Sequence, residues 1–339
     1  MNDPILQVTD LSKYFPPPLL ERIRSGTKAV KALDGVTFSV TRGETVGIVG
    51  ESGCGKSTLA RVLVGLDKPT GGIVRVDGID VAAMTRAQRR EFHRTVQMIF
   101  QDPFASLDPR MRVRRIIGEG WRAHPDLVPQ SRRERTAVEL LEAVRLPGEA
   151  LNRFPHQFSG GQRQRIGIAR ALAVQPRVLV CDEPTSGLDV SVQAQVLDLL
   201  RGLVRDRGLT VLFIGHDLPV IRSIADRIIV MYLGRIVEVG HAERIFTAPR
   251  HPYTKALLSA TPDPLKVVSG AAHERIMLQG DVPSPLDPPS GCRFRTRCWK
   301  AQELCARVEP VLADDVNSAA CHFPEGTPPE TVNGSSVAA

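Results

Sequence analysis

Long hydrophobic runs are missing from this sequence. No stretch approaches the roughly 18 consecutive apolar residues that a membrane-spanning helix needs, and the mean hydropathy is -0.09. The N-terminal residues Met1–Asp10 contain no basic segment followed by an apolar one, which argues against a cleaved export signal. We therefore expect a cytoplasmic protein that needs a partner for any role at a membrane.

Aromatic residues are also scarce, at 5% of the chain. Lys and Arg number 44 against 37 Asp and Glu, a net charge of +7, which permits an anionic partner. A surface that stacks on nucleic-acid bases needs aromatic side chains beside the basic ones. The arginines, such as Arg89, Arg90 and Arg94, have few aromatic residues beside them. A solvated, arginine-rich surface is favoured over a nucleic-acid partner.

The length and composition are those of a globular protein with roughly two domains. The chain has 339 residues, of which 42% are hydrophobic and 24% charged. These values exclude a wholly disordered or collagen-like chain.

Strands and helices alternate along the first two thirds of the sequence. Glu44–Gly50 predicts a buried strand, and Leu59, Val62, Leu63 and Leu66 predict one apolar face of the helix after it. Val178–Cys181 and Val211–Ile214 predict two further strands, the first followed by a helix. This alternation predicts an α/β fold with a mostly parallel sheet, whose ligands bind at the carboxyl ends of the strands.

Other segments interrupt or extend this α/β core. Residues 103–164 lack strand signals and predict an inserted helical subdomain, clearest over Ser131–Leu146. Two apolar runs over Ile228–Val239 predict a closing hairpin at Leu233-Gly234. We assign 1–240 to this core, 241–324 to a proline-rich appendage and 325–339 to a disordered tail.

A glycine-rich loop follows the first buried strand. Its glycines let backbone N–H groups turn toward an anion, Lys56 reaches the β- and γ-phosphates, and the Ser57 hydroxyl can bind Mg²⁺. The sequence thus predicts a phosphate-binding P-loop made of Gly50, Glu51, Ser52, Gly53, Cys54, Gly55, Lys56, Ser57 and Thr58.

Two acidic residues end the Val178–Cys181 strand. Asp182 can hold Mg²⁺, and Glu183 can polarise a water for attack on the γ-phosphate. Taken alone, the pair is better explained as a cap of the next helix. The P-loop favours the catalytic interpretation.

A second turn that can bind an anion precedes a predicted helix. It consists of Ser159, Gly160, Gly161 and Gln162. A plain helix cap explains this turn by itself. As an anion site it is redundant beside the P-loop unless it serves another molecule's nucleotide.

These motifs together resemble the ATP-binding subunits of ABC transporters. Gly50–Ser57, Gln101, Ser159–Gln162, Val178–Glu183, Ser186–Asp189 and His216 occur in that family's order and spacing. The resemblance covers about Val8 to Gly240 and implies an ABC cassette. It also implies head-to-tail dimers in which ATP lies between one P-loop and the partner's signature turn.

The resemblance also implies roles for individual residues. Tyr14 would stack on adenine, Gln101 would sense Mg²⁺ and the permease, Asp189 would couple the two sites, and His216 would contact the γ-phosphate. Ser57, Gln101 and Asp182 would bind Mg²⁺. Phe158 stands where the commonest signature begins with Leu, an apolar exchange that leaves the turn intact.

Three further segments narrow the resemblance to oligopeptide/dipeptide importers, and to their second ATPase subunit. They are Pro16–Lys28, His251–Leu258 and Gly280–Pro285. This implies peptide import, a second ATP-binding subunit, two permeases, an extracytoplasmic binding protein and a place on the cytoplasmic face of the inner membrane. Nickel or glutathione import remains an alternative, as does a soluble ABC ATPase acting on ribosomes or DNA.

Four of the six cysteines crowd into the proline-rich appendage. A segment with so little hydrophobic core needs a cross-link or a bound metal to be stable. Disulfides are disfavoured in a reducing cytoplasm, and a Cys-x2–4-Cys zinc motif is absent. We expect a structural [4Fe-4S] cluster, with zinc or unligated thiols as the alternatives. The importer resemblance points the same way. The expected ligands are Cys292, Cys298, Cys305 and Cys321.

Overall fold

The computed structural model describes residues 3–17, 28–102, 104–260, 275–313 and 315–326. Most of the expected insertion at Pro16–Lys28 and of the expected disordered tail lies outside these ranges, as does Pro103. The fold is an α/β cassette with a mostly parallel sheet, as the sequence predicted.

The larger sheet in the described part of the chain has seven strands in the order β11-β10-β9-β3-β8-β7-β6. Strands β9, β3, β8, β7 and β6 pair in parallel, whereas β10 and β11 are antiparallel. Every residue of β3, β7 and β8 is buried, which explains their continuous apolar sequences. The strands are β3 (Thr45–Val49), β6 (Val96–Ile99), β7 (Val178–Asp182), β8 (Thr210–Gly215), β9 (Arg227–Tyr232), β10 (Arg235–His241) and β11 (Ser318–Ala319).

A smaller antiparallel sheet, which the sequence analysis did not predict, has the order β2-β1-β4-β5. Register shifts interrupt the pairing of β1 with β2 and β4, so the regular alternation typical of a strand is broken. Its strands are β1 (Pro4–Phe15), β2 (Val30–Thr41), β4 (Gly71–Val76) and β5 (Ile79–Asp80).

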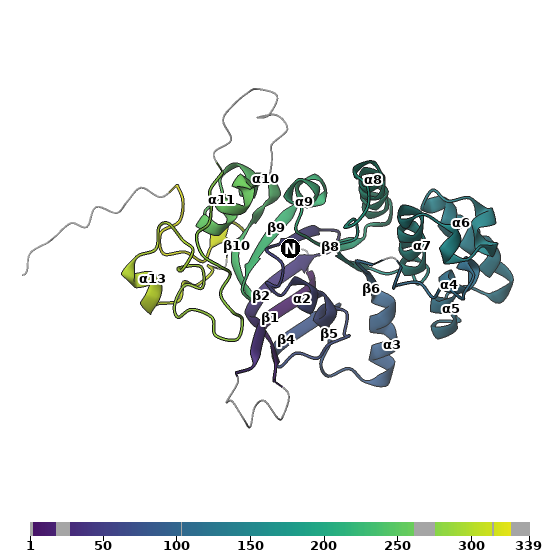
Figure 1. Ribbon diagram of the computed structural model, residues 1–339. Helices are drawn as coiled ribbons and strands as arrows, with labels where there is room; N and C mark the ends of the chain where they lie inside the picture. Colours follow the sequence, from purple (N-terminus) through teal and green to yellow (C-terminus); the bar gives the residue numbers. More distant parts are fainter. Residues whose placement is uncertain (1–2, 18–27, 103, 261–274, 314, 327–339) are drawn as a thin grey trace, which may run out of the picture.

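Helices flank the larger sheet on both sides (Figure 1). The helix after the P-loop ends at Leu63, and Gly65 adopts a positive φ of 73°. Leu66 therefore lies beyond the helix and is 52% exposed, so the prediction that it continues the apolar face was wrong. The helices here are α2 (Lys56–Leu63), α3 (Arg86–Thr95), α8 (Val190–Arg207), α9 (Leu218–Ile224), α10 (Ala242–Thr247) and α11 (Pro252–Ser259).

A group of helices projects from the β6 end of the sheet, where the helical subdomain was expected (Figure 1). The predicted helix over Ser131–Leu146 is shorter in the structure, because Arg145 takes a positive φ of 59° after its end. The group comprises α4 (Val113–Ile117), α5 (Glu119–Ala123), η1 (Gln130–Arg132), α6 (Arg133–Ala143), η2 (Gly148–Asn152), η3 (Pro155–Gln157) and α7 (Gly160–Leu172).

The C-terminal segment lies at the opposite end of the sheet, beside β10 (Figure 1). The predicted hairpin is confirmed: β9 and β10 pair around Leu233 and Gly234, which both have positive φ. On β10 the buried Glu238 carboxylate accepts backbone N–H groups of Arg250 (2.6 Å) and His251 (2.9 Å). This contact fixes the chain as it leaves the sheet. In the described residues after α11, one short helix, α13 (Glu303–Arg307), interrupts the loops.

A buried tryptophan anchors the helical group. The Trp121 side chain is 1% exposed, and its indole N–H donates to the Ala173 carbonyl at 2.8 Å. We expect Trp121→Phe to lower the free energy of unfolding by about 1–3 kcal/mol, because it leaves a buried carbonyl without its donor. Urea denaturation followed by circular dichroism measures the change.

The chain's other tryptophan is a matched control, because Trp299 is 46% exposed. Trp299→Phe should change the free energy of unfolding by less than about 0.5 kcal/mol. Equal losses in the two variants would contradict the anchoring role of Trp121.

Candidate functional site

The P-loop joins β3 to α2, and two of its glycines allow close backbone packing. A Cβ atom on Gly50 would lie 2.3 Å from the Met231 carbonyl oxygen, and one on Gly55 would lie 2.3 Å from that of Ala32. Gly55 also has a φ of 108°, which side chains other than hydrogen rarely permit. Glycine is therefore required at both positions.

Lys56 lies inside this loop and is 5% exposed. Its ammonium group donates to the carbonyls of Gly50 (2.7 Å) and Glu51 (2.9 Å). These contacts hold the charge against the loop that is to bind phosphates.

The predicted acidic residues meet the P-loop at the end of β7. The Ser57 hydroxyl donates to the Asp182 carboxylate at 3.3 Å, and burial raises the pKa of Asp182. Hydroxyl and carboxylate oxygens are the ligands that Mg²⁺ prefers, so this pair fits the ion. The next helix, α8, begins at Val190, so the two acids do not cap it.

Two other predicted residues, Gln101 and His216, meet at the carboxylate of Glu183. Its carboxylate oxygen Oε2 accepts from the Gln101 amide nitrogen at 3.1 Å, and the same oxygen is 3.3 Å from Nδ1 of His216. Glu183 itself has a positive φ of 45°. Gln101, Glu183 and His216 follow β6, β7 and β8, so one edge of the sheet collects them.

The second glycine turn, at residues 159–162, begins α7. Ser159 and Gln162 form a capping box, in which each side chain accepts the other's backbone N–H. A Cβ on Gly161 would lie 2.2 Å from Val192, so this turn packs against α8. The plain helix cap is thus present. The exposed Asp189 lies at the N-terminus of α8, and its side chain makes no capping hydrogen bond there.

Tyr14 lies near the end of β1, half-buried. Its hydroxyl donates to the Asp34 carboxylate, and the Lys31 ammonium lies 5.9 Å from the ring centroid. The ring position is therefore set by β2 residues as well as by β1.

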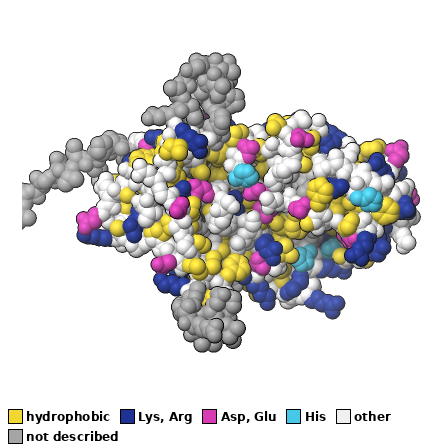
Figure 2. Space-filling model, in the orientation of Figure 1, with side chains coloured by type: hydrophobic (Ala, Val, Ile, Leu, Met, Phe, Trp, Pro, Cys, Tyr) yellow, Lys and Arg dark blue, Asp and Glu magenta, His cyan; other side chains and the backbone are white. Residues whose placement is uncertain are grey.

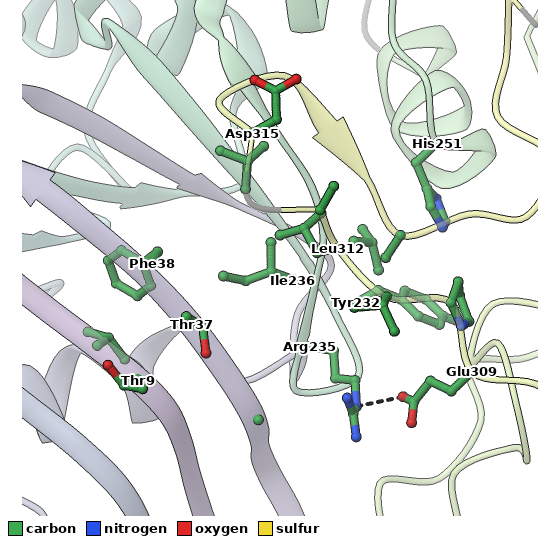
Figure 3. A pocket seen from close by; sticks show the side chains of 18 of the residues that line it. Thr9, Thr37, Phe38, Tyr232, Arg235, Ile236, His251, Glu309, Leu312 and Asp315 are labelled. Atoms are coloured by element: carbon green, nitrogen blue, oxygen red, sulfur yellow. Dashed lines mark ion pairs between the residues drawn. The ribbon is translucent and has the colours of Figure 1, made fainter.

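A large groove lies elsewhere, between β1, β2, β10 and residues 309–313 and 315–316 (Figure 3). It has a volume of about 790 Å³ and contains the ion pair of Arg235 with Glu309 at 2.8 Å. None of the predicted ATP-site residues lines it.

The four C-terminal cysteines line one small cavity of about 10 Å³; we call this the four-cysteine site. Burial raises the pKa of Cys292 and Cys321 to about 11. Four sulfurs are a donor set that suits iron or zinc, but the cavity is about the size of one water. No group of three or more His, Cys, Asp or Glu side chains in the described ranges is arranged to hold a metal ion.

Two residues outside the predicted motifs contact the P-loop. The Glu51 backbone N–H donates to the Tyr253 hydroxyl at 2.8 Å, and the Arg297 guanidinium pairs with the Glu51 carboxylate at 2.8 Å. Sequence reasoning missed both roles, since neither residue lies in a nucleotide-binding motif.

The visible surface mixes charges of both signs. Figure 2 shows Lys and Arg side chains interspersed with Asp and Glu rather than gathered in one patch on this face. Among the described helices, none is both long and apolar enough to span a bilayer.

Comparison with known proteins identifies the class. Residues 33–186 match the family described as ABC transporter, and residues 237–305 match the C-terminal region of oligopeptide/dipeptide transporters. The dimeric ATP-binding cassette MJ0796 bound to ADP and Pi is 29% identical, with a TM-score of 0.62 over 70% of this chain and 98% of that one. The site is thus that of an ABC-type ATPase.

Full-length relatives narrow the family. The oligopeptide transport ATP-binding protein OppF of Salmonella typhimurium is 49% identical, covering 91% of this chain and 92% of that protein. OppF of Escherichia coli is 48% identical with the same coverage. The chain therefore belongs to the ATP-binding subunits of the oligopeptide/dipeptide ABC transporter family, and it is an ATPase.

The geometry around Glu183 predicts a separation of binding from hydrolysis. Glu183→Gln should retain ATP, because the predicted phosphate contacts remain, while hydrolysis should fall about 10²- to 10⁴-fold because the predicted general base is removed. Phosphate release and binding of a fluorescent ATP analogue measure the two effects. Gel filtration with ATP should show a trapped dimer.

Lys56→Ala is the complementary variant, because it removes the predicted phosphate contact and leaves Glu183 in place. It should weaken ATP binding itself. Hydrolysis by Glu183→Gln at the parent rate would show that Glu183 is not the base.

Proposed function

We propose that this chain drives the ATP-dependent import of peptides across the cytoplasmic membrane. The observation that carries the proposal is the match of residues 237–305 to the oligopeptide/dipeptide transporter C-terminal region. It is supported by relatives named as oligopeptide transport ATP-binding proteins, which align over 91% of the chain. Peptides are thus favoured over nickel or glutathione, and a transporter over a soluble ABC ATPase.

The proposed hydrolysis assigns one task to each residue at the sheet edge. Lys56 and the P-loop N–H groups hold the phosphates, and Ser57, Asp182 and Gln101 hold Mg²⁺. Glu183 takes a proton from the attacking water. His216, which shares Oε2 of Glu183 with Gln101, contacts the γ-phosphate.

The remaining nucleotide contacts come from Tyr14 and from a second subunit. Tyr14 stacks on adenine. The 159–162 turn packs against α8 and serves the nucleotide of the partner cassette in a head-to-tail dimer, with Asp189 coupling the two sites. We propose a heterodimer with a second ATP-binding subunit.

The proposed partners in the membrane are two permease chains, fed by an extracytoplasmic binding protein. Phe104 is 61% exposed, and its ring is covered on one face by the Arg163 guanidinium at 3.9 Å. An exposed aromatic next to Gln101 suits contact with a permease helix. The chain would then lie on the cytoplasmic face of the inner membrane.

Uptake by cells tests both the substrate and the contact. Deleting the gene should abolish uptake of a labelled oligopeptide, and the parent chain should restore it. Phe104→Asp should fail to restore uptake while the purified protein keeps its ATPase activity. Val311→Asp, at another exposed apolar residue (84%), is the matched control and should restore uptake.

Labelled nickel and glutathione are measured in the same strains. If the deletion strain lost uptake of nickel or of glutathione but kept uptake of the peptide, the peptide assignment would be rejected. Restoration of uptake by Phe104→Asp would reject the permease contact.

We also propose that the four-cysteine site binds a structural [4Fe-4S] cluster. Two arguments support it: the four cysteines line one cavity, and metal binding favours the thiolates that burial otherwise disfavours. Because the cavity is so small, binding would require the cysteine loops to move apart.

Metal analysis of anaerobically purified protein tests this proposal. We expect a brown protein with nearly equal iron and acid-labile sulfide, lost in Cys298→Ser. Cys181→Ala, at a cysteine in the sheet core, should stay brown. Stoichiometric zinc would reject the cluster and keep the metal site; no metal would reject both.

A further inference from the structure

The segment Cys292–Cys298 touches the P-loop through a half-buried arginine, Arg297. The Arg297 side chain is 9% exposed, and that of Glu51 is 25% exposed. Two guanidinium nitrogens of Arg297 lie 2.8 and 3.2 Å from the two carboxylate oxygens of Glu51. Glu51 is the second residue of the P-loop, so a contact far along the chain reaches the phosphate-binding loop.

The backbone of Glu51 is held as well as its side chain. Its N–H donates to the Tyr253 hydroxyl at 2.8 Å, and its carbonyl accepts from the Lys56 ammonium at 2.9 Å. Tyr253 is fully buried and packs on Tyr232 and Phe294, with ring centroids 4.7 and 5.4 Å away. Glu51 thus connects Lys56 to a rigid aromatic group.

The ion pair has the features of a strong one. It is bidentate and largely out of water, where charge-assisted hydrogen bonds have their greatest effect. Burial by itself would lower the pKa of Arg297, but the Glu51 carboxylate and the Tyr232 hydroxyl raise it overall. Removing the guanidinium would leave the Glu51 carboxylate without its counterion in a partly buried position.

A second arginine of the same segment reaches the other side of the site. Arg293 donates to the Leu233 carbonyl at 2.5 Å and to the Asp34 carboxylate, which also accepts the Tyr14 hydroxyl. Arg293 and the Tyr14 hydroxyl hold the pKa of Asp34 below its usual value, against the effect of burial. The segment Cys292–Cys298 therefore contacts two nucleotide-binding elements: the P-loop, through Glu51, and Tyr14, through Asp34.

We propose that Arg297 is a positioning residue for ATP binding. It holds Glu51 in the conformation in which the P-loop backbone and Lys56 face the triphosphate, so the segment Cys292–Cys298 acts as a brace for the P-loop. The proposal does not depend on the role of Tyr14 or on a metal. It concerns the ATPase activity alone and holds whichever solute is transported.

The test compares ATP affinity and turnover in full-length variants. Arg297→Gln should raise the Kd of a fluorescent ATP analogue and the KM for ATP about tenfold, the factor that corresponds to about 1.4 kcal/mol. The kcat should change little, because Glu183, Gln101 and His216 are not contacted. Arg297→Lys should restore part of the affinity, since it keeps the charge but not the bidentate geometry.

Two controls separate positioning from general loss of structure. Arg295 lies in the same segment, but among the described residues its side chain hydrogen-bonds only to Ser290, so Arg295→Gln should leave Kd and KM unchanged. In a chain that already carries Glu51→Gln, Arg297→Gln should cause little further change in Kd or KM, because the two residues act through one contact. Thermal unfolding confirms that each variant is folded.

The proposal is overturned if folded Arg297→Gln binds ATP like the parent or like Arg295→Gln. It is also overturned if the Arg297 and Glu51 effects simply add, or if kcat falls with KM unchanged.

Discussion

The close packing of the P-loop backbone against the backbone of neighbouring strands is the constraint on which the site depends. Gly50 and Gly55 have no room for a side chain, because carbonyls of Met231 and Ala32 would lie 2.3 Å from a Cβ atom. The Cys54 carbonyl accepts the Gly234 N–H at 2.9 Å, and the Gly234 carbonyl accepts the Asp34 N–H at 3.0 Å. The loop, the β9–β10 turn and β2 are therefore locked together, which also places Asp34 and Tyr14 relative to the P-loop.

Parallel strands supply the second half of the site. Because β6, β7 and β8 run in the same direction, the residues that follow them arrive at a single edge. Gln101, Glu183 and His216 come together there on one carboxylate oxygen. The P-loop after β3 reaches the same edge, where Ser57 contacts Asp182. The strand ends of the sheet thus position Gln101, Glu183 and His216 beside one another.

The C-terminal segment adds support from outside the cassette core. Glu238 fixes the chain leaving β10, and Tyr253, Phe294 and Tyr232 form an aromatic cluster behind the P-loop. Arg297 extends from this cluster to Glu51. The four cysteines line a cavity beside this aromatic cluster. The cysteine loops and Arg297 are therefore held by residues next to one another.

Local sequence by itself determined the P-loop, the buried strands, the hairpin and the acids at the end of β7. Each of these depends on near neighbours: glycine conformations, continuous apolar runs, or a charged residue just after a strand. It did not reveal the antiparallel sheet, because the register shifts of β1 disturb its alternation, and it extended the apolar face of α2 to Leu66 although Gly65 ends the helix. Only the tertiary structure decided that Arg297 pairs with Glu51, since nothing in either residue's surroundings in the sequence specifies a partner 246 positions away. Such long-range pairs depend on how the sheet order brings distant parts of the chain together.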